Sequence, residues 1–297
     1  MPLKFSIRSF VPLLTYTCLI IGGCAAQNST FPYSSKEPMP VPVLFAPDLI
    51  STKQAEEWSF SFTPDGTTIY FQRGDYEKYT IYESHYKNKK WGTPQKSKLA
   101  PETLSQDGDT FITRDGSKIF FASNRSTSGT KQDNDIWMAT RSGDHWGEPS
   151  PLGEPINSGF QEWLPSVASN GNLYFQSDRP GGTGQIDLYV SKWKDGKYTE
   201  PESLGTEINT SENDESPYIA PDESYLIFAR GGSTLYISLR HGDKWSTPQP
   251  IKLPGDTGTI KYSPNVSPDS KYLFYTSNKA GTADVYQIDF NIDDYKG

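Results

Sequence analysis

Residues 162–209 read EWLPSVASNGNLYFQSDRPGGTGQIDLYVSKWKDGKYTEPESLGTEIN, and this stretch decides the fold. It starts at the acidic Glu162, turns at Asn170 and Gly171, and continues into an apolar run and a Gly-rich loop after Arg179. A second apolar run and an aromatic-x-x-Pro segment follow. Tight turns between short apolar runs are typical of antiparallel strands. The stretch therefore predicts one sheet of short strands.

The same pattern recurs along the chain at a spacing of about 50 residues. Each copy has a turn of the Pro-Asp-Gly type followed by consecutive large apolar residues. The five apolar runs are 69–71, 119–121, 173–175, 226–228 and 273–275. A strand that is apolar on both faces must be covered on both faces, as in a sheet that lies between two others. The copies are therefore expected to pack against one another.

The copies also share a third strand and an aromatic-x-x-Pro segment, such as Trp146-x-x-Pro149, which fits an outer edge strand because proline lacks one donor. The fifth copy ends without this segment, and residues 44–50 have the spacing to supply the missing strand. We therefore predict an all-β fold: a five-bladed β-propeller of four-stranded blades, closed into a ring by an N-terminal strand. Residues 43–297 would form this single domain.

The units 177–209 and 214–228 resemble the WD40-like Pro-Asp repeat (PD40) of TolB-type propellers. They are closer still to the five-bladed propellers of OmpA-type envelope lipoproteins of Bacteroidetes. The resemblance covers nearly all of the chain after residue 43 and implies a propeller with protein partners in the cell envelope. No OmpA-like segment is expected after residue 290, and nothing resembles the N-terminal domain of TolB. Peptidoglycan anchoring and Tol-Pal assembly are therefore not implied.

Residues 1–23 have the features of a signal peptide: a positive start at Lys4 and Arg8, then a short apolar stretch. The end of this segment, Ile-Gly-Gly before Cys24, resembles a lipobox, which implies cleavage before Cys24 and a lipid anchor on it. The Pro-rich residues 24–42 predict a flexible tether. Ala25 is not the Asp of an inner-membrane retention signal, which favours the outer membrane, on its periplasmic or its surface side.

Charge and cysteine usage restrict the partners. The chain has 28 Lys and Arg residues against 36 Asp and Glu, a formal net charge of −8. No basic stripe is present, so nucleic acid is excluded as a partner. Cys18 and Cys24 both belong to the signal segment, so we expect neither a disulfide nor a cysteine metal site. We expect no cofactor; segments 107–109 and 133–135 are acidic enough for Ca²⁺ but lack a full ligand loop.

The innermost strand of each predicted blade starts with a charged residue. These residues are Glu57, Asp107, Glu162, Asp214 and, in the fifth copy, Lys261. Ring closure would bring them to one rim of the central channel, where they could bind a cation, a basic peptide end or a sugar. Glu57, Glu162 and Asp214 could also supply an acid and a base for glycoside cleavage. Alternatively, each recurs because every blade uses it in a turn or a hydrogen bond.

Two further sets of residues are candidates. Trp58 and Trp163 follow two of these carboxylates and could stack on a sugar or peptide, or pack between blades. A set of basic residues follows the second strand of each copy: Arg73, Arg125, Arg179, Arg230 and Lys279. A cationic ring is one interpretation of this set, and a salt bridge to a neighbouring acid within each blade is the favoured one.

Together these features predict a monomeric propeller, held at the bacterial cell envelope by a lipid anchor, that acts as a binding or scaffolding module. Its partner would be an envelope protein or a small ligand such as a glycan. The alternative is a carbohydrate-active enzyme that uses carboxylates in the central funnel, since five-bladed propellers also serve glycoside hydrolases. That alternative requires two carboxylates that face each other across an open pocket, about 5 to 10 Å apart.

Overall fold

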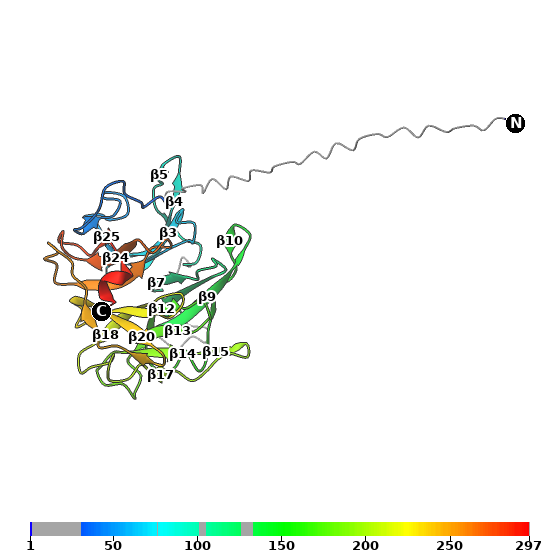
Figure 1. Cartoon of the computed structure of the whole chain (residues 1–297), viewed down its shortest axis with the longest axis vertical. Coiled ribbons are helices and arrows are strands. Elements are labelled where there is room, and N and C mark those ends of the chain that lie inside the picture. The colour runs from blue at the N-terminus through cyan, green and yellow to red at the C-terminus, as the bar shows by residue number, and fades with distance from the viewer. Residues whose placement is uncertain (2–30, 76, 101–104, 126–132, 297) are drawn as a thin grey trace. The chain divides into compact units, whose positions relative to one another are not determined.

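The structure, a computed structural model, describes Met1 and residues 31–75, 77–100, 105–125 and 133–296. Residues 31–297 form one compact unit. Its strands form five main antiparallel sheets that follow one another around a common centre (Figure 1). The predicted five-bladed β-propeller is confirmed. Within the described residues, no helix has the length and apolar character needed to cross a membrane.

The blades follow the chain order. Blade 1 contains β2 (Glu56–Phe62), β3 (Thr68–Gly74), β4 (Tyr79–Lys87), β5 (Lys90–Trp91) and β6 (Gln95–Lys96). Blade 2 contains β7 (Asp107–Ile112), β8 (Lys118–Ser123), β9 (Asp135–Ser142), β10 (His145–Trp146) and β11 (Ser150–Pro151). Blade 3 contains β12 (Glu162–Val167), β13 (Leu173–Ser177), β14 (Asp187–Ser191), β15 (Trp193–Lys194), β16 (Lys197–Tyr198) and β17 (Glu202–Ser203).

Blades 4 and 5 repeat this arrangement. Blade 4 contains β18 (Asp214–Ile219), β19 (Tyr225–Arg230), β20 (Thr234–His241), β21 (Lys244–Trp245) and β22 (Gln249–Pro250). Blade 5 contains β23 (Lys261–Val266), β24 (Tyr272–Ser277) and β25 (Asp284–Asp289), and the 3₁₀ helix η1 (Ile292–Tyr295) follows. One detail differs from the prediction: the outermost strand begins after the aromatic-x-x-Pro segment, as β6 does after Pro94.

The hydrophobic core is divided into five clusters, one between each pair of adjacent blades. Between blades 1 and 2, for example, Tyr70 and Ile81 pack with Ile119 and Phe121. The second strand of every blade is buried on both faces, which explains its run of consecutive apolar residues. Burial of these side chains between blades stabilises the ring as a whole.

The N-terminal strand closes the ring as predicted. In β1 (Val43–Leu44), Val43 lies opposite Gln287 of β25, so β1 completes blade 5. The backbone amide of Phe45 then donates to the carbonyl of Val285 at 2.8 Å. The Phe45 ring is buried between blades 5 and 1. The two ends of the propeller are thereby held together in one sheet.

The predicted tether is shorter than expected, because residues 31–42 contact the propeller. Tyr33 is buried and packs against Phe62 and Phe274, with ring centroids 5.2 and 5.7 Å away. The backbone amide of Met39 donates to the Asp289 carboxylate at 2.6 Å. The buried ring of Tyr33 holds this segment against the propeller, although its proline content is high. Residues 24–30 and the signal segment lie outside the described residues.

Candidate functional site

All five innermost strands contain a β-bulge near their start. In blades 2 to 5 the residue two places after the predicted charged residue has a positive φ. These residues are Asp109 (55°), Leu164 (49°), Ser216 (56°) and Ser263 (50°). A bulge bends its strand and changes the direction of the side chains on it. In blades 2 to 5 the bulge comes after the charged residue and the residue that follows it, so these two point to opposite faces as in a regular strand, and the bulge changes the direction of the residues after them.

The four carboxylates predicted to line the channel lie inside the blades instead. Each of them is 0% exposed and forms an ion pair with an arginine of its own blade. The pairs are Glu57 with Arg73 (2.8 Å), Asp107 with Arg125 (2.5 Å), Glu162 with Arg179 (2.8 Å) and Asp214 with Arg230 (2.7 Å). Their predicted position at the rim of the channel is corrected, because these side chains are buried against arginines of their own blades, and the favoured salt-bridge interpretation of these arginines is confirmed.

Blade 3 shows what such a pair does. Glu162 also accepts hydrogen bonds from the backbone amide of Ser158 at 3.1 Å and from its hydroxyl at 2.5 Å. Arg179 donates to the carbonyl of Ile156 at 2.5 Å and lies over the Phe175 ring at 5.0 Å. The ion pair thus fastens the linker from the preceding blade onto the innermost strand. The arginines of the other three blades make the equivalent bonds to the carbonyls of Leu49, Ile50, Leu99 and Ile208.

Blade 5 reverses the charges of this arrangement. Lys261 stands where the other blades have a carboxylate, and its Nζ lies 3.9 Å from the Asp256 carboxylate of the preceding linker. It also donates to the carbonyl of Gly258. Asp256 accepts a further bond from the Tyr275 hydroxyl at 2.6 Å. Lys261 therefore stabilises its blade, and its predicted place among channel ligands is corrected as well.

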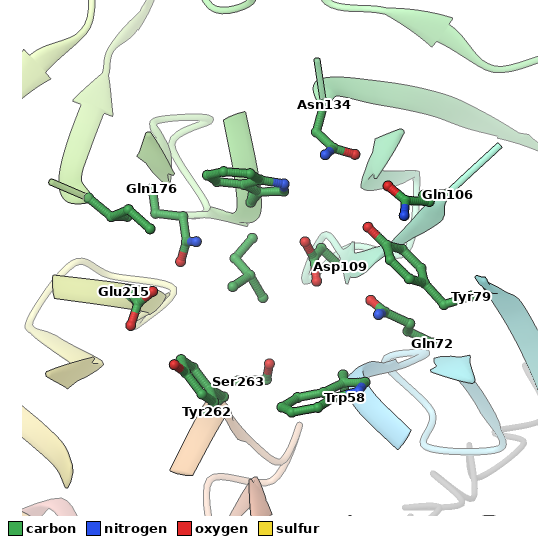
Figure 2. Close-up of a pocket in the computed structure, with 13 residues that line it drawn as sticks. Trp58, Gln72, Tyr79, Gln106, Asp109, Asn134, Gln176, Glu215, Tyr262 and Ser263 are labelled. Carbon is green, nitrogen blue, oxygen red and sulfur yellow. The ribbon is translucent and has the colours of Figure 1, made fainter. Parts of the chain in front are cut away.

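A cavity of about 350 Å³ lies in the channel, and side chains from all five blades line it (Figure 2). Trp58 and Trp163, both predicted, are part of its wall. Sequence reasoning missed Asp109, Glu215 and Tyr262, which lie one or two places after the repeated charged residues. The sequence did contain an indication of these positions. Their residue types differ from blade to blade, whereas the repeated position one or two places before them carries a charged residue in every copy.

Amide side chains form most of the remaining polar wall. Gln72, Gln106, Asn134 and Gln176 line the cavity. The Gln176 Oε1 atom accepts from the backbone amide of Ser216 at 2.7 Å, so this side chain links blades 3 and 4. Amides carry both donors and acceptors without a charge. The cavity can therefore bind polar groups of either kind.

Both carboxylates of the cavity have raised pKa values. Burial raises the pKa of Asp109 to about 6, although hydrogen bonds from the Ser59 hydroxyl and the Leu164 backbone amide oppose the shift. Burial likewise raises the pKa of Glu215, and a hydrogen bond with the Tyr262 hydroxyl opposes it. Within the described part of the chain, neither carboxylate forms an ion pair with Lys, Arg or His.

The two candidate calcium segments do not form a metal site in the part of the chain that the structure describes. No group of three or more His, Cys, Asp or Glu side chains is placed there to hold an ion. Asp107 of the first segment is bonded to Arg125, and Asn134 of the second lies in the cavity wall.

No known protein family and no curated protein matches the sequence, but solved structures do. A protein of unknown function from Dyadobacter fermentans has 15% identity and a TM-score of 0.52, over 86% of this chain and 83% of its own. A thermostable family-43 glycoside hydrolase has 9% identity and a TM-score of 0.52, over 79% and 89%. TolB from Agrobacterium tumefaciens has 16% identity and a TM-score of 0.48, over 75% and 70%. The likeness shows the propeller fold alone.

The pH dependence of the propeller's stability should become flatter when Asp109 is replaced by Asn. An unfolded aspartate has a pKa of about 4, whereas that of Asp109 is about 6, so the folded protein binds more protons between these values. The free energy of unfolding therefore falls as pH rises from about 4 to 6, by roughly 1–2 kcal/mol. Asn tolerates a positive φ, so thermal melts should show a higher Tm for Asp109→Asn at pH 7.5 than for the wild type.

Asp115→Asn is the matched control, and its effect on the Tm should have the opposite sign. A hydrogen bond from the Thr113 hydroxyl and another from the Ser117 backbone amide hold the pKa of Asp115 below its usual value. An ionised Asp115 therefore stabilises the fold near neutral pH, and its replacement should lower the Tm there. Identical pH profiles for the wild type and Asp109→Asn would contradict the raised pKa of Asp109.

Proposed function

We propose that this chain is a cell-envelope lipoprotein whose propeller binds a small polar ligand in the channel cavity. One observation carries the binding proposal: aromatic, amide and carboxylate side chains from all five blades converge on one cavity of about 350 Å³. Small-molecule sites are commonly concave, of similar size, and lined by apolar and aromatic side chains with a few polar groups. Every blade contributes at least one of these side chains from the start of its innermost strand.

The envelope location rests on the sequence. Residues 1–23 have signal-peptide features, Cys24 ends a lipobox-like segment, and units such as 177–209 resemble Pro-Asp repeats. The lipid anchor on Cys24 would hold the propeller at the outer membrane, within reach of envelope proteins as well as small ligands. One chain closes all five blades, which supports a monomer. Cell fractionation tests the anchor: Cys24→Ser should move the protein from the membrane to the soluble fraction.

The three carboxylates that the enzyme alternative would use as acid and base are all engaged in structural contacts. Glu57 and Glu162 each accept a hydrogen bond from a backbone amide and pair with an arginine, and Asp214 does the same. None of the three lines the cavity. A fully paired, buried carboxylate cannot approach a glycosidic bond. The carboxylates that do line the cavity are Asp109 and Glu215, and binding of a ligand by this wall is the function that we propose.

Trp163→Ala should abolish most of the binding. Calorimetry of the purified mature chain against sugars, amines and short peptides would identify a ligand, and the variant should then bind at least about tenfold more weakly. The reason is that Trp163 offers a large apolar face in the cavity wall. The thermal melt of the variant shows whether the fold is retained.

Trp193→Ala is the matched control for that experiment. Trp193 is 40% exposed, lies on β15 at the outside of blade 3 and does not line the cavity. Its replacement removes a tryptophan of the same blade and should leave the affinity unchanged. Equal losses in the two variants would count against a binding site in the channel, and turnover of a bound glycan by the wild type would favour the enzyme alternative.

A further inference from the structure

The cavity wall alternates between aromatic and acidic side chains around the ring. In blade order, the starts of the innermost strands contribute Trp58, Asp109, Trp163, Glu215 and Tyr262. Figure 2 labels Trp58, Asp109, Glu215 and Tyr262 around the cavity. Three aromatic residues thus alternate with two carboxylates. The rings of Trp58 and Tyr262 are in contact, with centroids 6.1 Å apart at an angle of 64°, and form one continuous aromatic side.

The charges in this wall are not balanced. The pocket is lined by Asp109 and Glu215, and no described Lys, Arg or His residue lines it. Glu215 is 7% exposed, lies in the wall, and has the Tyr262 hydroxyl as a hydrogen-bonding neighbour. The preceding residue, Asp214, instead forms an ion pair with Arg230 at 2.7 Å. Blade 4 therefore neutralises one buried carboxylate and leaves its neighbour facing the cavity.

Physical chemistry indicates what such a wall favours. A buried carboxylate without a cation is costly, because removal from water penalises its charged form. A ligand that brings a positive charge offsets this cost on binding, and the faces of Trp and Tyr attract cations as well. A neutral sugar would use the aromatic faces and the amides and could donate hydroxyl hydrogen bonds to the two carboxylates, but it would not offset their charge.

We propose that the channel cavity binds an organic ammonium ion, with its positive charge between Asp109 and Glu215 and against the rings of Trp58, Trp163 and Tyr262. This inference rests on the proposed binding function and names its ligand class. The formal net charge of −8 also favours the approach of cations. The four amide side chains of the wall would contact the polar remainder of the ligand.

The test compares two probes of the same shape. Choline and its neutral isostere 3,3-dimethylbutan-1-ol differ in one charge, and both are titrated calorimetrically into the mature protein. We expect choline to bind at least about tenfold more tightly than the alcohol. A peptide that carries trimethyllysine, tested in parallel, shows whether the same ammonium group is accepted on a protein partner. Equal affinity for choline and the alcohol would overturn the proposal.

A variant pair isolates the charge of the cavity. Glu215→Gln keeps the size of the side chain and an acceptor for Tyr262. It should weaken choline binding about tenfold or more, while the protein still melts cooperatively and with a Tm no lower than that of the wild type, because burial raises the pKa of Glu215. Glu202→Gln removes the same charge from a side chain that is 61% exposed on β17, and should change nothing. Unchanged choline affinity in Glu215→Gln would overturn the proposal.

The outcomes also separate this proposal from the function on which it rests. If sugars bind in a Trp163-dependent manner and ammonium probes do not, the ammonium proposal fails and the channel remains a binding site. If no small ligand of any class binds, both fail. Choline binding that is lost in Glu215→Gln and in Trp163→Ala supports both.

Discussion

Arg179→Met is expected to lower the free energy of unfolding by about 3–5 kcal/mol, because it leaves Glu162 buried without a cation. Glu162 is 0% exposed, so water cannot replace the lost partner. The substitution also removes the hydrogen bond to the carbonyl of Ile156 and the contact with the Phe175 ring. The linker between blades 2 and 3 would lose its bond to Arg179 and keep the bonds of Ser158 to Glu162. Urea unfolding of the two proteins measures the difference.

Two further variants make that experiment specific. Lys192→Met breaks an ion pair of similar length, 3.1 Å to Glu202, between side chains that are 54% and 61% exposed. This substitution should lower the free energy of unfolding by less than about 1 kcal/mol. The double variant Glu162→Leu with Arg179→Met removes both buried charges and should recover part of the lost stability. Similar effects of Arg179→Met and Lys192→Met would show that the buried pair does not hold the blade.

A chain that begins at Ser51 should lose cooperative unfolding, whereas one that begins at Phe31 should retain it. The shorter chain lacks β1, so the edge of β25 is left unpaired, and an unpaired edge strand promotes association with other chains. It also lacks Tyr33 and Phe45, which pack between blades 5 and 1. Size-exclusion chromatography and urea unfolding would show aggregates or a broad transition.

The single substitution Phe45→Ala gives a graded version of this experiment. The Phe45 ring is 6% exposed and contacts the rings of Phe62 and Phe274 at centroid distances of 5.7 and 5.4 Å. Removal of the ring should lower the free energy of unfolding by about 3–5 kcal/mol, because it leaves a cavity in the core. An unchanged unfolding midpoint in both Phe45→Ala and the shorter chain would contradict closure of the ring by the N-terminal strand.

The fold was predictable because its signals are local and repeated. Turns such as Asn170-Gly171 and runs such as 173–175 depend on few neighbouring residues, and five copies of the same signal reinforce one another. Closure by residues 44–50 followed from the strand missing in the last copy. The docking of residues 31–42 was not predictable in the same way, because Tyr33 finds its partners in Phe62 and Phe274, which are distant in sequence.

The candidate site was predicted only in part. Trp58 and Trp163 were identified because they stand beside the repeated carboxylates, at the start of the innermost strands. The carboxylates themselves were misplaced, because the sequence does not show on which face of the innermost strand each of them lies or that the blade buries it. Residues that recur in every blade, such as Glu162, serve the blade, whereas positions that change from blade to blade, such as Glu215, face the cavity.

The sequence by itself determined the number of blades, their order, the strand that closes them and a structural salt bridge for the arginine of each of the first four blades. These properties follow from turn chemistry, apolar periodicity and repetition, which act over short stretches. Only the tertiary structure decided which side chains reach the channel. Asp214 and Glu215 are both in regular register with β19, so they point to opposite faces of β18; packing of the blade buries Asp214 against Arg230 and leaves Glu215 in the cavity wall. One position along β18 therefore separates a structural carboxylate, Asp214, from a candidate ligand-binding carboxylate, Glu215.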